Sequence, residues 1–162
     1  MTGYDVAALL DRARRAGVHI ATAESCTGGM VAAALTDIPG SSDVVERGFV
    51  TYTNRAKEEM LGVTRASLDA YGAVSEQVAK EMAEGALAHS TADLAVSITG
   101  IAGPGGSEFK PEGRVCFGLA RAGRDTRTET VEFGALGRAN VRVAARDHAL
   151  ALLDSAFSDS AQ

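Results

Sequence analysis

The segment LAVSITGIAGPGG, residues 94–106, joins a short apolar run to the densest cluster of glycine in the chain. Residues 94–99 predict a buried β-strand, because a short apolar run that ends at glycine is typical of the interior of a sheet. The glycines that follow predict either a long irregular loop or a loop whose backbone N–H groups surround an anion. Their spacing matches neither a P-loop nor the dinucleotide-binding fingerprint.

Helix and strand patterns alternate on both sides of this segment. Further strands are expected over residues 18–23, 44–53, 114–120 and 126–133, the last two as an antiparallel hairpin. Helices are expected over residues 4–16, 27–36, 54–61, 75–89 and 138–157. Asn54 and Ser75 are the expected N-caps of the third and fourth helices. This order predicts an α/β fold, a three-layer α/β/α sandwich with a mixed, mostly parallel sheet.

The length and composition fit one globular domain over residues 1–162, with its core at about 4–156. The 16 Lys and Arg against 21 Asp and Glu give a net charge of −5. This balance argues against a nucleic-acid or membrane partner but leaves room for a small anionic ligand in a local pocket. Residues 1–10 lack the pattern of a signal peptide, and no apolar run approaches the roughly 18 residues of a membrane span. We therefore expect a cytoplasmic protein.

Cysteine and histidine are too few and too scattered to suggest a metal site. Cys26 and Cys116 lie far apart, and the three histidines show no zinc-ligand spacing. No metal site is therefore predicted. A homo-oligomer, most simply a dimer, is the expected assembly, because symmetric dimers are the commonest assemblies of soluble proteins.

A first candidate for chemistry is AESCTGG, residues 23–29, where a strand turns into a helix. Backbone N–H groups at a helix start lack intrahelical partners, so a nucleophile here would find donors for an oxyanion nearby. Ser25 and Cys26 compete for the role of nucleophile, and the residues alone leave both open. Glu24 is equally consistent with a surface charge and with a carboxylate that supports the site. The simplest alternative is a structural turn capped by Ser or Thr.

A second candidate is the segment GFVTYTNRAK, residues 48–57. Tyr52 would end a strand, and Lys57 would lie one turn into the following helix, so both could reach the same cleft. Lysine can act as a base where desolvation lowers its pKa toward neutrality. The alternatives are a solvated Lys57 paired with Glu58 or Glu59, and a half-buried aromatic at Tyr52.

Basic residues outside these segments could hold an anion. Arg138 and Arg142 are four residues apart on the last predicted helix and could clamp a phosphate, although a solvated stripe is the alternative. Ser107 and Lys110 have the Ser-x-x-Lys spacing of penicillin-recognising enzymes. That motif requires a helix, which the flanking glycine and proline disfavour here, so we predict at most a contact of Lys110 with an anionic substrate.

Four strings in order resemble the CinA C-terminal domain family. They are TAESCTGG at residues 22–29, GFVTYTN at 48–54 together with Lys57, GAVS at 72–75, and SITGIAGPGG at 97–106. The resemblance spans about residues 4–156 and implies a single α/β/α domain with a mixed sheet. The characterised enzymes of the family are nicotinamide-nucleotide amidases. Larger CinA proteins carry an additional pyrophosphatase-like domain for which this chain has no room, so a stand-alone amidase is expected.

The resemblance also implies roles for single residues. Ser25 would be the nucleophile, Lys57 the general base and Tyr52 an assisting residue. Thr99 would supply the hydroxyl beside the glycine loop, residues 100–106. The implied reaction is the hydrolysis of nicotinamide mononucleotide to nicotinic acid mononucleotide and ammonia, a step of pyridine nucleotide recycling, without metal or cofactor. We expect the oxyanion donors around residues 27–29. The expected substrate contacts are Thr27, Gly28, Gly29, Gly100, Gly103, Gly105, Arg138 and Arg142.

Two other functions stay open at this stage. A nucleotide-binding regulatory module without turnover would use the same glycine loop and arginines. A cysteine hydrolase would use Cys26 in place of Ser25.

Overall fold

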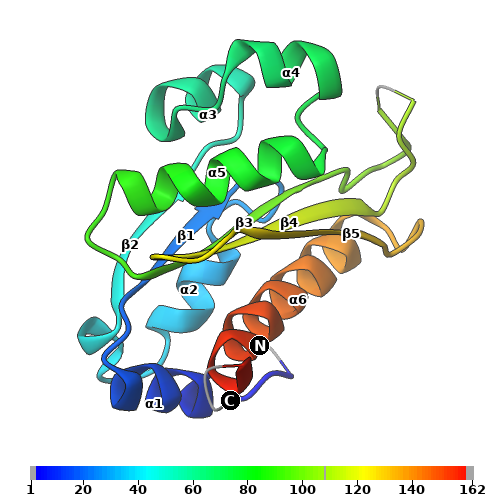
Figure 1. Ribbon diagram of the computed structural model, residues 1–162. Helices are drawn as coiled ribbons and strands as arrows, with labels where there is room; N and C mark the ends of the chain where they lie inside the picture. The colour runs from blue at the N-terminus through cyan, green and yellow to red at the C-terminus, as the bar shows by residue number, and fades with distance from the viewer. Residues whose placement is uncertain (1–2, 108, 160–162) are drawn as a thin grey trace.

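Five strands form one mixed sheet in the computed structural model, which describes residues 3–107 and 109–159 (Figure 1). They are β1 (Ile20–Glu24), β2 (Val45–Val50), β3 (Leu94–Gly100), β4 (Arg114–Arg121) and β5 (Arg127–Glu132), in the spatial order β2-β1-β3-β4-β5. β1 pairs in parallel with β2 and β3, whereas β4 pairs antiparallel with β3 and β5. Among these five strands, β4 therefore runs against the other four. The mixed, mostly parallel sheet is confirmed, and the strand expected at residues 94–99 is its centre.

Helices cover both faces of the sheet, which confirms the three-layer α/β/α sandwich (Figure 1). One layer contains α1 (Val6–Ala16), α2 (Met30–Thr36) and α6 (Arg138–Asp159), and the other contains α3 (Asn54–Leu61), α4 (Arg65–Tyr71) and α5 (Glu76–Ala88). An apolar cluster fills each interface, with Leu9, Leu35 and Leu150 in the first and Leu61 and Met82 in the second. No helix in the described part of the chain is long and apolar enough to span a bilayer.

The cap of α3 and the start of α2 differ from the prediction. The predicted N-cap Asn54 is wrong: the Thr53 hydroxyl accepts the N–H of Ala56 at 3.0 Å, and Asn54 is the first residue of α3. The second helix begins at Met30 and not at residue 27, because Gly28 and Gly29 take positive φ angles of 56° and 106° in the preceding turn. The predicted cap at Ser75 is confirmed, since its hydroxyl accepts the N–H of Val78.

The carboxyl ends of three neighbouring parallel strands meet at one edge of the sheet. Glu24, the last residue of β1, lies opposite Val50 of β2 and Ile98 of β3. The segments that follow these strands are therefore neighbours in space, although about 25 to 50 residues of chain separate them. Ligands of open α/β sheets bind at this kind of edge.

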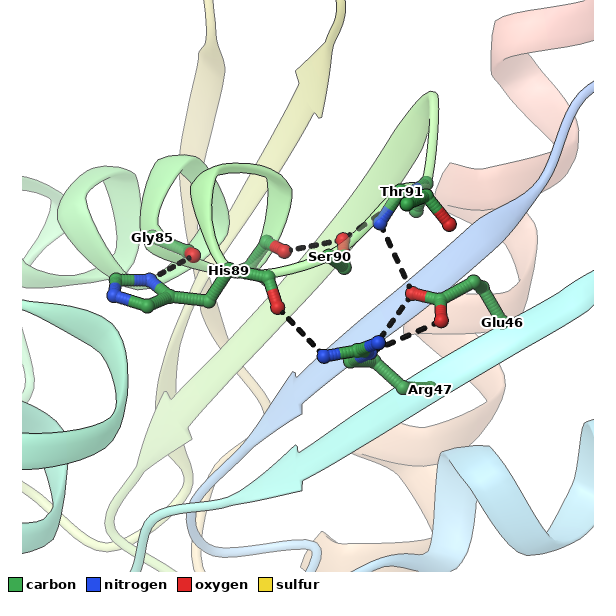
Figure 2. A network of polar contacts seen from close by, with 8 residues as sticks. Glu46, Arg47, Gly85, His89, Ser90 and Thr91 are labelled. Atoms are coloured by element: carbon green, nitrogen blue, oxygen red, sulfur yellow. Dashed lines mark hydrogen bonds and ion pairs between the residues drawn. The ribbon is translucent and has the colours of Figure 1, made fainter.

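At the opposite end, a polar network ties the edge strand β2 to the end of α5 (Figure 2). The Glu46 carboxylate accepts the Thr91 N–H at 3.2 Å and pairs with the Arg47 guanidinium at 2.9 Å. Arg47 in turn donates to the backbone carbonyl of His89 at 2.9 Å. The network fixes β2, the strand that leads into the segment carrying Tyr52 and Lys57.

Candidate active site

The three strand ends surround a pocket of about 180 Å³. Ser25 follows β1, Tyr52 and Lys57 follow β2, and Thr99 lies at the end of β3. All four predicted catalytic residues line this pocket. Of the predicted substrate contacts, Gly100 and Arg138 line it as well, together with residues without a chemical signal in the sequence: Ala73, Val74 and Ala102.

Lys57 is buried and points at Ser25. Its side chain is 1% exposed, and its Nζ lies 3.0 Å from Ser25 Oγ. The same nitrogen lies 3.0 Å from the Thr51 carbonyl oxygen and 3.1 Å from that of Tyr52. In the described residues Lys57 has no carboxylate partner, and the neighbouring Glu58 and Glu59 pair with arginines instead. The alternative of a solvated, ion-paired lysine is therefore excluded.

Burial lowers the pKa of Lys57 from its usual 10.5 to about 8. A neutral amine has two N–H groups and one lone pair. The two backbone carbonyls can accept both N–H groups, which directs the lone pair at the Ser25 hydroxyl. In this form Lys57 can accept the Ser25 proton, which is what a serine nucleophile requires.

The burial of Lys57 gives a testable dependence of stability on pH. Between pH 8 and 10.5 the unfolded lysine is protonated while the folded one is neutral, so unfolding takes up a proton and stability rises with pH. We expect the unfolding free energy of wild type minus that of Lys57→Met to rise by about 3 kcal/mol from pH 7 to 11. Urea titrations across this range measure the difference.

The matched control is Lys80→Met, which removes an exposed lysine of α5. A wild-type minus Lys57→Met difference that stays constant from pH 7 to 11 would mean that Lys57 keeps its proton in the folded protein.

Ser25 is better placed than Cys26 to act as nucleophile. Ser25 contacts Lys57, and its N–H donates to the Ile98 carbonyl at 3.0 Å, which anchors it to β3. Burial raises the pKa of the Cys26 thiol to about 11. The thiol therefore stays protonated at neutral pH, and a protonated thiol is a poor nucleophile.

Glu24 is a buried acceptor at the start of α2 and not a surface charge. Its side chain is 0% exposed, and its carboxylate accepts the Thr27 hydroxyl at 2.6 Å and the N–H groups of Gly29, Val31 and Ala32 at 3.0–3.1 Å. The Gly28 N–H donates to the Ser25 carbonyl. The amides of Gly28 and Gly29 are thus already used and cannot be the free oxyanion donors that the sequence predicted. The Thr27 N–H donates to no backbone carbonyl in the described structure, but Thr27 is fully buried and does not line the pocket.

Tyr52 and Thr99 make their side-chain contacts away from the Ser25–Lys57 pair. The Tyr52 side chain is 59% exposed, and its hydroxyl accepts from Arg138 at 2.9 Å. The Thr99 hydroxyl donates to the Ala73 carbonyl at 2.9 Å, which holds one wall of the pocket. Tyr52 reaches Lys57 through its backbone carbonyl.

The two arginines of α6 do not form one clamp. Arg138 lines the pocket and donates to the Gly103 carbonyl at 2.8 Å as well as to Tyr52. Arg142, one turn further, does not line it and donates to the carbonyls of Cys26 and Thr27 at 3.0 and 3.3 Å.

The glycine loop is organised by Glu112, a residue that the sequence analysis missed. Its carboxylate accepts the N–H groups of Gly105 at 2.6 Å and Gly137 at 3.1 Å. Gly103 has a φ of 93°, a left-handed conformation that favours glycine, and a Cβ there would lie 2.5 Å from this carboxylate. Gly103 and Gly105 therefore shape the loop and do not line the pocket. Nothing in the local sequence distinguishes Glu112 from a surface carboxylate.

Ser107 and Lys110 pair with each other in an antiparallel β-bridge and not as neighbours on a helix, as their flanking residues predicted. Lys110 donates to the carbonyls of Tyr71 and Val74 at 2.7 and 2.6 Å, which links the glycine loop to a wall of the pocket. Within the described ranges, no group of three or more His, Cys, Asp or Glu could hold a metal ion.

The sequence and the fold are similar to those of known proteins. A family model described as the CinA C-terminal domain matches residues 5–157. A CinA-like protein from Chlorobium phaeobacteroides is 60% identical over 120 residues, which cover 72% of this chain and 29% of that protein. The nicotinamide-nucleotide amidohydrolase PncC of Enterobacter agglomerans is 57% identical over 117 residues, which cover 72% of this chain and 70% of that protein.

Among solved structures, the competence/damage inducible protein CihA from Agrobacterium tumefaciens superposes with a TM-score of 0.89. The two are 45% identical, and the match covers 98% of each chain. The chain spans about a third or less of the length of the first curated relatives that it matches.

Proposed function

Because this chain belongs to the CinA C-terminal domain family, we propose that it is an amidohydrolase that converts nicotinamide mononucleotide to nicotinic acid mononucleotide and ammonia by Ser–Lys chemistry. The observation that carries the proposal is the 3.0 Å contact between Ser25 Oγ and the buried Nζ of Lys57, at a pocket. The amidohydrolase name of the relative from Enterobacter agglomerans supports the reaction class.

The first half of the reaction forms an ester on Ser25. Neutral Lys57 takes the hydroxyl proton as Oγ attacks the carboxamide carbon, and the carbonyl oxygen becomes an oxyanion. Lys57, now an ammonium, donates a proton to the amide nitrogen. The C–N bond then breaks, and ammonia leaves.

The second half restores the enzyme. Lys57 takes a proton from a water molecule as the water oxygen attacks the ester carbon, and it returns that proton to Ser25 Oγ when the ester breaks. The sum is one amide and one water converted to one carboxylic acid and one ammonia. One lysine can perform all these transfers because its pKa of about 8 makes both of its forms accessible near neutral pH.

Arg138 is the side chain best placed to hold the phosphate of the nucleotide. It lies on the pocket, and its two described hydrogen bonds use two of the five N–H groups of a guanidinium. The exposed Tyr52 ring beside it offers an aromatic face to the positively charged pyridinium ring of the substrate.

The proposal is tested by incubating the chelator-treated protein with nicotinamide mononucleotide and following ammonia and the acid product. Nicotinamide riboside, which lacks the phosphate, and nicotinamide, which lacks the ribose as well, are the matched substrates. We expect the nucleotide to be hydrolysed with the highest kcat/KM, and Arg138→Ala to raise its KM by about 10-fold or more. Arg55→Ala, which removes an exposed arginine of α3, is the control.

Saturable binding of the nucleotide without any ammonia release would contradict the amidase proposal. It would favour the regulatory module that binds nucleotide without turnover.

A further inference from the structure

Two charged side chains hold the turn that follows Ser25, residues 26–29, and neither side chain lines the pocket. Glu24 from β1 accepts four hydrogen bonds from residues of the turn and of α2. Arg142 from α6 donates to the carbonyls of Cys26 and Thr27. Neither side chain transfers a proton in the proposed hydrolysis, so their contacts with the turn need another explanation.

The Glu24 carboxylate occupies the backbone amides at the start of α2, so they cannot bind a ligand. A buried carboxylate is costly unless it is paired or fully hydrogen-bonded, and in the described part of the chain Glu24 has no cationic partner. Its four donors satisfy it instead, and among them are the amides of Gly29, Val31 and Ala32. These amides are therefore closed to a substrate.

Arg142 fixes the orientation of two peptide planes. In a trans peptide the C=O and the N–H point in opposite directions. Because Arg142 draws the Cys26 carbonyl toward α6, the Thr27 N–H of the same peptide points away from α6. Its second bond, to the Thr27 carbonyl, orients the next peptide, whose N–H belongs to Gly28 and donates to the Ser25 carbonyl.

Two adjacent amides beside the nucleophile, those of Cys26 and Thr27, make no hydrogen bond to another described residue. The Ser25 N–H donates to the Ile98 carbonyl, and the N–H groups of Gly28 and Gly29 are also used. The N–H groups of Cys26 and Thr27 donate to no backbone carbonyl among residues 3–107 and 109–159. Cys26 lines the pocket and its N–H contacts only its own thiol, whereas Thr27 is fully buried beside it. Preorganised backbone donors next to a nucleophile are what an oxyanion hole requires.

We propose that Arg142 and Glu24 are positioning residues for an oxyanion hole formed by the backbone N–H groups of Cys26 and Thr27. Arg142 also polarises the hole, because a cation on the Cys26 carbonyl strengthens the hydrogen bond that the Thr27 N–H of the same peptide donates. Arg142 thus acts on the reaction through the turn and not as the phosphate clamp that its helical spacing suggested. The inference rests on the proposed role of Ser25 as nucleophile.

The test compares Arg142→Ala and Arg142→Lys with wild type in two assays. The first measures kcat and KM for nicotinamide mononucleotide. The second measures the labelling rate of Ser25 by a fluorophosphonate, with mass spectrometry to locate the adduct. In this reaction Oγ forms a bond to phosphorus, the P–F bond breaks, fluoride leaves, and Lys57 takes the serine proton. The phosphoryl oxygen gains negative charge where the oxyanion would lie, so labelling reports on the hole without the nucleotide.

We expect Arg142→Ala to lower kcat and the labelling rate by about 10- to 100-fold, with KM within about twofold of wild type. The kcat and labelling rate of Arg142→Lys should lie between those of Arg142→Ala and wild type, because a lysine keeps the charge but cannot donate to both carbonyls through a planar guanidinium. Glu24→Gln should lower both rates as well, since the amide oxygen can replace Oε1 but its NH₂ group faces the Ala32 N–H. Glu24→Gln provides a second test of the positioning role if Arg142→Ala does not fold.

The control for a purely structural effect is Arg12→Ala. Arg12 also makes two hydrogen bonds through its guanidinium, to Asp154 at 2.7 and 2.8 Å, and these link α1 to α6 away from the pocket. It should lower Tm without lowering the labelling rate of the folded protein.

The outcomes separate this inference from the choice of substrate. Slow labelling of Arg142→Ala supports the positioning role even if wild type releases no ammonia, and in that case only the substrate assignment fails. The positioning role is overturned if Arg142→Ala and wild type share the same kcat or labelling rate, if Arg12→Ala loses as much as Arg142→Ala, or if folded wild type is not labelled at Ser25.

Discussion

Ser25→Ala is expected to reduce ammonia release from nicotinamide mononucleotide by about 10⁴-fold or more. The change removes the only atom within reach of Lys57 Nζ that can form an ester in the described structure, while the two backbone carbonyls around that nitrogen remain. Because Ser25 is anchored through its backbone N–H, the fold should persist, and circular dichroism and Tm check this. Steady-state release of ammonia measures the effect.

Cys26→Ala is the matched variant, since it removes the neighbouring thiol and keeps the backbone amide. Its turnover should stay within about 10-fold of wild type, because burial raises the pKa of this thiol to about 11 and leaves it unreactive at neutral pH. An active Ser25→Ala together with an inactive Cys26→Ala would reverse the assignment and support a cysteine hydrolase.

Lys57→Met is expected to reduce kcat/KM by about 10²- to 10⁴-fold, because it removes the base that activates Ser25 and the acid that protonates the leaving ammonia. The methionine fills a similar volume, so the loss should not come from a collapsed pocket. Lys57→Arg is the sharper variant. An arginine keeps a positive charge beside Ser25 but does not release its proton, so it should be as inactive as methionine.

The pH profile of wild type tests the same group. The pKa of Lys57 lies near 8, so the fraction of neutral amine rises through this pH. We expect kcat/KM to increase with pH up to about 8 and then to level off, as the free enzyme loses the Lys57 proton. A flat profile from pH 6 to 10 would argue against Lys57 as the base.

Much of this fold could be predicted because local patterns agreed with the tertiary structure. The strand at residues 94–99 was an apolar run bounded by glycine, and it became the buried centre of the sheet. α4 gave no such signal, since it is seven residues long and buries Leu68 alone among its described side chains. The cap at Thr53 could not be distinguished from Asn54, because both residue types favour that position.

The site was predictable where chemistry follows directly from a strand end. The residues alone predicted a shared cleft for Tyr52 and Lys57, and the family resemblance added Ser25. The structure explains this grouping, because the segments follow neighbouring parallel strands. The different contacts of Arg138 and Arg142 could not be predicted, since four-residue spacing places both on one helix face. Only the crossing of α6 over the turn sends one to the pocket and the other to two backbone carbonyls. The reach of the Glu24 carboxylate to amides five to eight residues ahead is likewise a tertiary effect.

The contact between α6 and the turn after Ser25 links the two ends of the chain. The turn lies near the start of the sequence, whereas Arg142 lies about 115 residues later. During synthesis the chain emerges from its N-terminus, so the nucleophile is made long before the helix that completes its surroundings. In refolding, catalytic competence should therefore appear only after the most distant segments have docked. Turnover would then report completion of the native topology. A chain whose α6 has not yet docked would carry Ser25 but would be inactive.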